Sequence, residues 1–478
     1  MTAALTPTPP PPAAPTLASI GTVLIDIFEP RSPYSPDTPQ SHSSSLPESR
    51  IVTPQITPAR RPTRLPSLES LNTPRTPQLT TFNEPLGGGT PVIGGGALYA
   101  LVGARVWLPA REMRTVIDRA EPSSPSSSSS WGVKGEEADI DLNDHDAMFA
   151  AAAAKSAAAA ADEDDFPVEL EHEIRQFGDE MWVYNRGPGL RTPRARIAYD
   201  GDVRTYQHVV KPSLRTGTQI AAGPLFGAEY LHVSPPYGPS DLLHLLDEID
   251  AECTGWEPKI AFEPTPSSCH SGERANLERV APRVEILSPN HEELLSFYGV
   301  ALPDTLEETC AAVEVAIRHL LAIGVGANGE GIVVVRCGAI GACVGTRAGG
   351  LVWTPAYWAN DSDRVRDVTG AGNAFIGGFV AGLKITTGNP YEAVLYATVS
   401  SSFVVEQLGL PAITPAYSST PSSSPLGLTM SAAQGSPPEV IEGMAALKLR
   451  AAARIEMWNE DAPQRRLEFL RARARVFA

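Results

Sequence analysis

The residues with the clearest chemical potential are Thr369, Gly370, Ala371 and Gly372, a glycine-rich turn that begins an apolar segment reaching Leu383. We expect this segment to be a helix. A turn of this kind presents backbone N–H groups to a ligand, and the helix dipole adds positive potential at the same point. The turn therefore predicts a binding site for an anion such as phosphate. Close packing of the glycines alone is the alternative explanation.

Other segments alternate between strand and helix patterns. The apolar run 22–28, which contains Asp26, is expected to be the first strand. A second glycine turn, Gly94, Gly95 and Gly96, precedes an expected helix in 94–108, and an expected strand in 284–290 is followed by helical residues. A continuous strand is expected at 331–338.

Apolar strands alternate with helical segments through most of the chain, which is typical of a doubly wound, mostly parallel α/β sheet. Two alternating runs, 194–201 and 203–210, flank a Gly-Asp turn and predict a hairpin. Hairpins around 181–210 predict a small antiparallel β lid above the sheet. The expected core spans 17–412. Removing every low-complexity stretch from the whole chain leaves roughly 330 residues, enough for one large domain.

Four stretches are rich in Pro, Ser, Thr or Ala and carry too few large apolar residues to offset the entropy of ordering. We expect them to be disordered. They are the N-terminal 1–16, the insertions 31–84 and 120–165, and the segment 413–437. The remaining 438–478 predicts a C-terminal helical segment rich in arginine, with either an exposed face or contacts to the acidic core.

Composition excludes several classes of function. The net charge of −17 argues against general affinity for nucleic acid or anionic membranes, and no apolar run is long enough to span a bilayer. The five cysteines contain no CxxC pair, which disfavours a disulfide scaffold and a structural zinc site. The beginning of the chain lacks the features of a secretory signal. We therefore expect a cytoplasmic protein, with the nucleus as the alternative.

The segment from Asp367 to Phe375, DVTGAGNAF, resembles the carboxy-terminal signature of the PfkB sugar and nucleoside kinases, Asp-Thr-x-Gly-Ala-Gly-Asp-x-Phe. Other segments follow the family's order. Among relatives, Glu-Pro-Thr-Pro at 263–266 and the substituted signature look most like the fungal maintenance-of-killer branch. The resemblance implies a ribokinase-like fold with a small lid, the cofactors ATP and Mg²⁺, and a sugar or nucleoside as acceptor. A homodimer stays open.

The resemblance also implies roles for individual residues. Gly370, Ala371 and Gly372 would stabilise the transferring phosphoryl group, with Asp367 opening the signature. Asn290 would organise phosphate, Glu293 would hold Mg²⁺ through water, and the nucleotide would lie near Arg336, Gly338 and Gly341. The acceptor would be oriented by Asp26, the glycines 94–96 and the position of Tyr99.

Three positions depart from the family's pattern. Asn373 stands where the family has an Asp as general base, and an amide cannot take a proton near neutral pH. Tyr99 lies where an Asn sugar contact is expected. Arg336 replaces a Thr and predicts either a phosphate contact or a structural salt bridge.

Loss of a general base typically costs about 10²–10⁴ in rate, whereas phosphoryl transfer depends mostly on positioning and charge. The sequence therefore predicts a kinase, or alternatively a pseudokinase that binds a nucleotide or a partner. On this basis Asn373→Asp is expected to raise activity if the side chain faces an open pocket.

Two weaker signals have simpler explanations. His232 follows an expected strand, and we expect it to be packed and hydrogen-bonded rather than catalytic. The acidic run 162–165 is most simply a solvated surface segment.

Overall fold

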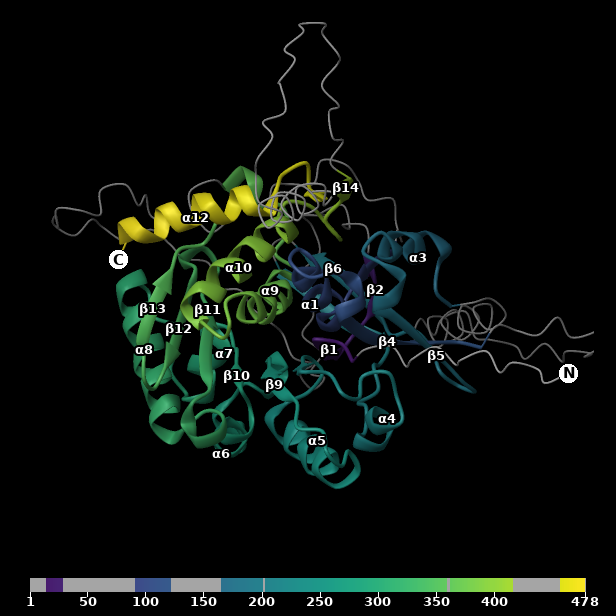
Figure 1. Ribbon diagram of the computed structural model, residues 1–478, viewed down its shortest axis with the longest axis horizontal. Coiled ribbons are helices and arrows are strands. Elements are labelled where there is room, and N and C mark those ends of the chain that lie inside the picture. The colour runs from purple at the N-terminus through teal and green to yellow at the C-terminus, as the bar shows by residue number, and fades with distance from the viewer. Residues whose placement is uncertain are drawn as a thin grey trace, which may run out of the picture.

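The computed structural model describes residues 14–28, 91–121, 165–200, 203–358, 362–415 and 456–477. Their main feature is a sheet that, within these residues, has nine strands in the order β13-β12-β11-β10-β9-β8-β1-β4-β5 (Figure 1). Its strands are β1 (Leu17–Ile20), β4 (Met113–Arg119), β5 (Trp182–Arg186), β8 (Tyr230–Val233), β9 (Lys259–Phe262), β10 (Ile286–Leu287), β11 (Ile332–Arg336), β12 (Ala342–Thr346) and β13 (Gly350–Thr354).

The sheet is wound in both directions from β1. From β1 the chain reaches β4 and β5 on one side, and it then continues through β8 to β13 on the other side. Every neighbouring pair from β5 to β11 is parallel, whereas β11, β12 and β13 pair antiparallel. The predicted doubly wound, mostly parallel sheet is confirmed. In such sheets the crevice where the winding reverses, here between β1 and β8, is the usual place for ligands.

Helices cover both faces of the sheet, and each face has its own apolar core. Alternate strand residues divide between the cores, as the side-chain period of two requires: Val334 faces one core, and Val333 and Val335 face the other. The first core contains residues of α1 (Gly96–Arg105), α3 (Val168–Arg175), α9 (Ala371–Ile385), α10 (Pro390–Val404) and α12 (Pro463–Phe477). The second contains residues of α4 (Gly217–Ala221), α5 (Pro239–Glu252), α6 (Arg274–Val280), α7 (His291–Phe297) and α8 (Leu306–Ile323).

A separate small sheet has the order β3-β2-β6-β7, formed by β2 (Leu24–Phe28), β3 (Pro91–Gly94), β6 (Arg194–Asp200) and β7 (Val203–Val210). The predicted hairpin of β6 and β7 is confirmed, but β2 pairs parallel with β6, so this sheet is mixed. Contrary to the prediction, 182–186 forms the edge strand β5 of the main sheet. Strand periodicity cannot tell which sheet a strand joins.

The expectation that 22–28 is the first strand is wrong. The chain enters the main sheet earlier, at β1, and 24–28 belongs to the small sheet. β1 has only four residues. Its polar Ser19 can be fully buried because its hydroxyl has a partner: Ser19 Oγ lies 2.8 Å from His232 Nδ1. Gly21, with φ of 149°, lies between the two strands, where the chain leaves one sheet for the other.

The expected insertions lie largely outside the described residues, but their borders differ from the expectation in three places. Backbone contacts tie Pro15 and Thr16 to 229–230. Asp165 is buried and accepts hydrogen bonds from the backbone N–H groups of Ala120 and Thr192, so it is no solvated residue. β14 (Ile413–Pro415), where low-complexity chain was expected, pairs with β15 (Glu456–Trp458), where a helical segment was expected. In none of the described parts is a helix long and apolar enough to cross a bilayer.

Candidate functional site

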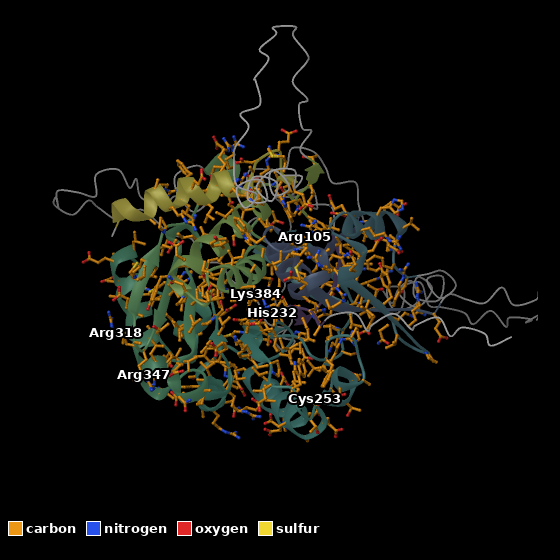
Figure 2. The ribbon with its side chains drawn as sticks, in the orientation of Figure 1. Arg105, His232, Cys253, Arg318, Arg347 and Lys384 are labelled. Atoms are coloured by element: carbon orange, nitrogen blue, oxygen red, sulfur yellow. The ribbon has the colours of Figure 1, made fainter. Side chains whose placement is uncertain are left out.

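Five strands of the main sheet bring polar residues to their carboxyl ends. Ser19 lies in β1 and His232 in β8, Glu263 and Ser288 directly follow β9 and β10, and Arg336 ends β11. His232 lies near the centre of the molecule (Figure 2) and is fully buried. We call this group, with Glu293 and Asn373, the strand-end cluster.

The glycine-rich turn of 369–372 stands beside the strand-end cluster and begins α9, as predicted. Gly370 has φ of 78°, a left-handed conformation that favours glycine, and a Cβ there would lie 2.2 Å from the Tyr99 ring. Asp367 Oδ1 accepts hydrogen bonds from the backbone N–H (3.0 Å) and the hydroxyl (2.9 Å) of Thr369. Asp367 therefore shapes the turn through this oxygen.

The glycines further along α9 allow close contacts between helices. A Cβ on Gly377 would lie 1.7 Å from the carbonyl oxygen of Ala100 in α1, and one on Gly378 would lie 2.3 Å from Ser400 Oγ in α10. These glycines bring α9 close to α1 and α10, and this contact fixes where the turn stands.

Arg336 links the turn to two carboxylates. Its Nη1 lies 3.6 Å from Glu263 Oε1, and its Nη2 lies 3.7 Å from Glu293 Oε2 and donates to the carbonyl oxygen of Ser288 at 2.8 Å. A Cβ on Gly372 would lie only 2.0 Å from Nη1. The predicted salt bridge is observed, and it holds the guanidinium directly against the turn at 369–372.

Glu263 is the functional candidate that the sequence analysis missed. It is 1% exposed and accepts a hydrogen bond from Asn373 Nδ2, and its Oε2 lies 3.6 Å from His232 Nε2. Burial alone would raise the pKa of this carboxyl, but Arg336, His232 and Asn373 together hold it below its usual value. A charged residue directly after the apolar run KIAF was the available signal, since strand ends are where such sheets bind ligands.

Asn290 and Glu293 form a reciprocal cap at the start of α7. Glu293 N–H donates to Asn290 Oδ1 and Asn290 N–H donates to Glu293 Oε2, both at 2.8 Å. Burial raises the pKa of the Glu293 carboxyl, an effect that Arg336 offsets only in part. Both predicted residues thus lie next to Arg336.

Of the residues expected to orient the acceptor, Gly96 of α1 stands beside Asn373 of the cluster, whereas Asp26 and Gly94 lie side by side on β2 and β3 of the small sheet. A Cβ on Gly94 would lie 2.6 Å from Asp26 Oδ2, and one on Gly96 would lie 2.6 Å from Ser234 Oγ and 3.1 Å from Asn373 Nδ2. Asp26, which is buried, stands in the middle of β2 and not at the end of the first strand. Tyr99 is 2% exposed and supports the turn at Gly370.

Gly338 and Gly341 form the turn between β11 and β12, directly after Arg336. The Gly341 N–H donates to the Gly338 carbonyl at 3.1 Å, and the Cys337 N–H donates to the Gly341 carbonyl at 2.7 Å. A Cβ on Gly341 would lie 2.0 Å from the Thr354 carbonyl oxygen. The turn therefore requires glycine at 341, and it connects Arg336 of the strand-end cluster to β12.

A magnesium ion fits this site only if Glu293 holds it through a bound water. Among the described residues, no group of three or more His, Cys, Asp or Glu side chains could hold a metal ion. One oxygen of Glu293 is engaged in the α7 cap, which leaves the other for a bound water. Mg²⁺ usually keeps several waters and takes one or two carboxylates together with substrate phosphates. Glu293 suits that arrangement, and a dedicated protein cage is excluded for the described residues.

Comparison with known proteins bears on the class of this site. Residues 217–416 match the model of the pfkB family carbohydrate kinases. This segment contains the turn at 369–372, Asn290, Glu293, Arg336, Gly338 and Gly341, whereas Asp26 and 94–96 lie outside it. The resemblance that the signature motif indicated is therefore confirmed.

Two curated relatives are fungal, which fits the predicted branch. An uncharacterized protein of Schizosaccharomyces pombe is 26% identical over 343 residues, covering 68% of this chain and 80% of that protein. The protein MAK32 of Saccharomyces cerevisiae is 28% identical over 269 residues, covering 52% of this chain and 71% of that protein. Among solved structures, ribokinase from Cryptococcus neoformans matches with 17% identity, a TM-score of 0.45, and coverage of 83% of this chain and 95% of that one.

Proposed function

We propose that this protein is a kinase that transfers the γ-phosphoryl group of ATP to a hydroxyl of a sugar or nucleoside. One observation carries the proposal: the turn at 369–372 and the Arg336 guanidinium meet at the carboxyl ends of the parallel strands. The first backbone N–H groups of a helix lack partners within the helix, and the dipole favours negative charge there. Together these groups suit a polyphosphate.

The chain's own residues would then do three things. The N–H groups of Gly370 and Gly372, together with Arg336, would stabilise charge on the transferring phosphoryl group, which passes through a loose transition state. Asp26 and the glycines 94–96 would orient the acceptor hydroxyl. Glu293 would hold, through water, the Mg²⁺ that neutralises phosphate charge. The new bond joins the acceptor oxygen to phosphorus as the bond to ADP breaks, and solvent takes the hydroxyl proton.

The position of Asn373 supports a second candidate, a pseudokinase that binds a nucleotide without transferring phosphate. Asn373 stands beside Gly96 at the site, where the resemblance implies a general base, and its amide donates to Glu263 instead. This contact is compatible with slow turnover and also with a complete loss of turnover.

A turnover assay separates the two candidates. The full chain is incubated with ATP, Mg²⁺ and a panel of sugars and nucleosides, and phosphorylated product is detected by mass. A kinase gives one product class, and Asp26→Asn lowers kcat/KM for the acceptor by about tenfold or more while nucleotide affinity stays unchanged. Nucleotide binding without product across the panel would favour the pseudokinase.

A further inference from the structure

The contact between Asn373 and Glu263 fixes the orientation of an amide at the proposed site. A carboxylate that is ionised only accepts hydrogen bonds, so the amide nitrogen of Asn373 must face it. The amide carbonyl oxygen then points the other way. Because Glu263 is 1% exposed and Asn373 is half-buried, the carboxylate lies beneath the amide.

The groups around this pair favour the ionised form of Glu263. From β8, His232 Nε2 lies 3.6 Å from its Oε2, and from β11, Arg336 Nη1 lies 3.6 Å from its Oε1. Glu293 of α7 lies on the far side of Arg336, at 3.7 Å from Nη2. From α1 and the end of β8, Gly96 and Ser234 add no charge. Glu263 thus carries the negative charge closest to Asn373.

We propose that Glu263 is the positioning residue of this site and holds the carbonyl oxygen of Asn373 toward the acceptor hydroxyl. This proposal rests on the proposed kinase function. On this proposal the site retains a carboxylate, that of Glu263, but it is buried beneath Asn373, the residue that would contact the substrate. The amide above it accepts a hydrogen bond from the hydroxyl and takes no proton.

The pairing changes the outcome expected for Asn373→Asp. The sequence alone predicts a gain in activity, provided that the side chain faces an open pocket. The structure places Glu263 against it, so the substitution brings two carboxylates into contact, and one of them must take up a proton. The double variant Glu263→Gln/Asn373→Asp restores one amide and one carboxylate with their order exchanged, which puts the carboxylate on the side of the substrate.

Thermal unfolding without substrate tests the pair independently of turnover. Between mildly acidic and alkaline pH, Asn373→Asp should lose melting temperature progressively as the pH rises, because the shared proton is lost. The double variant should follow the wild-type profile. A single variant whose profile matches the wild type at every pH would overturn the pairing.

A second measurement covers the case in which Asn373→Asp does not fold. Asn373→Ala keeps the helix and removes the amide, and it is combined with Glu263→Gln. The double loss in melting temperature should be clearly smaller than the sum of the two single losses, because both remove the same contact. Additive losses would overturn the proposal.

Turnover then tests the role of the pair. The double variant should exceed both the wild type and Asn373→Asp by about 10²-fold, the lower end of a general base's contribution. If unfolding shows the pair and no variant forms product, the proposed kinase function fails while the pairing stands. If Asn373→Asp alone gains as much as the double variant, the positioning role of Glu263 is wrong.

Discussion

Arg336 holds two carboxylates that would otherwise be buried without a counter-charge. Glu263 is 1% exposed, the side chain of Glu293 is 11% exposed, and both lie within ion-pair distance of the guanidinium. Removing one partner of a buried ion pair typically costs about 3–5 kcal/mol of stability. At the scale of single residues, this makes Arg336 a structural residue as well as a candidate phosphate ligand.

We expect Arg336→Met to lose stability in a pH-dependent manner. In the wild type the pKa of Glu263 is held low, so its contribution is present above the unfolded pKa and is lost as pH falls through the folded pKa. Without Arg336, burial raises the pKa, and the contribution reverses sign. Urea unfolding should therefore show a larger loss at about pH 8, where ordinary carboxyls are fully ionised, than at about pH 4.5, which is close to their ordinary pKa. An equal loss at both would contradict the account.

Gly370 offers a second test at this scale. Gly370→Ala should destabilise the turn twice, through its positive φ and through the Tyr99 ring 2.2 Å from the new Cβ. Gly350→Ala is the matched control, because Gly350 has φ of 73° and nothing within 4 Å of an added Cβ. The control should cost about 1–2 kcal/mol in urea unfolding. We expect Gly370→Ala to lose more stability than the control and to weaken nucleotide binding. Equal losses of stability would show that the Tyr99 ring moves aside for the new Cβ.

Among elements, α7 brings its cap to the site through local chemistry. Asn290→Ala removes a side-chain cap, which typically costs about 1 kcal/mol. Thr305→Ala removes the comparable cap of α8, where Thr305 Oγ1 accepts from the Glu308 N–H at 3.2 Å. Both variants should lose similar stability in urea unfolding. Only Asn290→Ala should also weaken ATP binding in calorimetry, because its cap lies beside Arg336. Equal ATP affinities in the two variants would show that the α7 cap does not contribute to nucleotide binding.

What the sequence could predict at the element scale was local. The turn at 370–372 and the cap of Asn290 and Glu293 are short motifs whose geometry follows from neighbouring residues. The place of Glu263 directly after a strand was a signal, but its role could not be assigned because it depends on Arg336 and Asn373, which are distant in sequence and meet it only in the folded structure. Asp26 was placed in the wrong sheet for the same reason, since apolar periodicity identifies a strand but not its partner.

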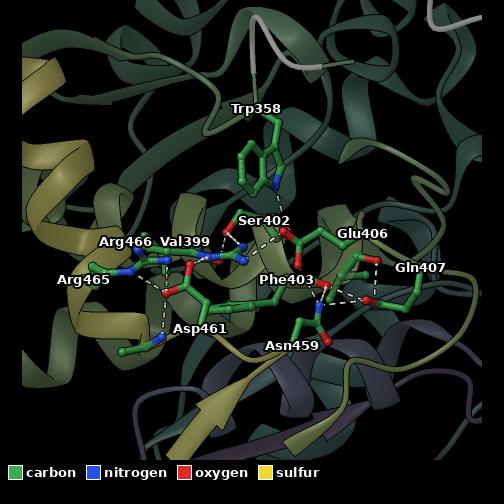
Figure 3. A network of polar contacts seen from close by, with 12 residues as sticks. Trp358, Val399, Ser402, Phe403, Glu406, Gln407, Asn459, Asp461, Arg465 and Arg466 are labelled. Carbon is green, nitrogen blue, oxygen red and sulfur yellow. Dashed lines mark hydrogen bonds and ion pairs between the residues drawn. The ribbon is translucent and has the colours of Figure 1, made fainter. Parts of the chain in front are cut away.

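At the scale of the whole molecule, the C-terminal helix α12 packs against α10 through one buried arginine, Arg466 (Figure 3). Arg466 is 2% exposed, pairs with Asp461 at 2.9 Å and Glu406 at 2.8 Å, and lies over the Phe403 ring at 3.8 Å. Of the two expectations for the basic C-terminal helix, contact with the acidic core is the one observed for Arg466 and for Arg471, which pairs with Glu392. Removing Arg466 would leave two carboxylates without their shared partner.

We therefore expect Arg466→Met to cost about 3–5 kcal/mol in urea unfolding, the range for breaking a buried ion pair. Its neighbour provides the control, because the Arg465 side chain is 75% exposed although it also pairs with Asp461. Arg465→Met should change stability by at most about 1 kcal/mol, as exposed ion pairs do. Similar losses in both variants would mean that α12 is not held by the buried contact.

The proposed function depends on a phosphate site formed by the turn at 369–372 and Arg336. Calorimetric titration of the folded wild-type chain with ATP and Mg²⁺ tests it most directly. We predict saturable one-to-one binding, weakened by Glu293→Gln through its hold on Mg²⁺ and unchanged in the distant variant Arg465→Met. A folded wild-type chain that shows no affinity for ATP under these conditions would contradict the claim.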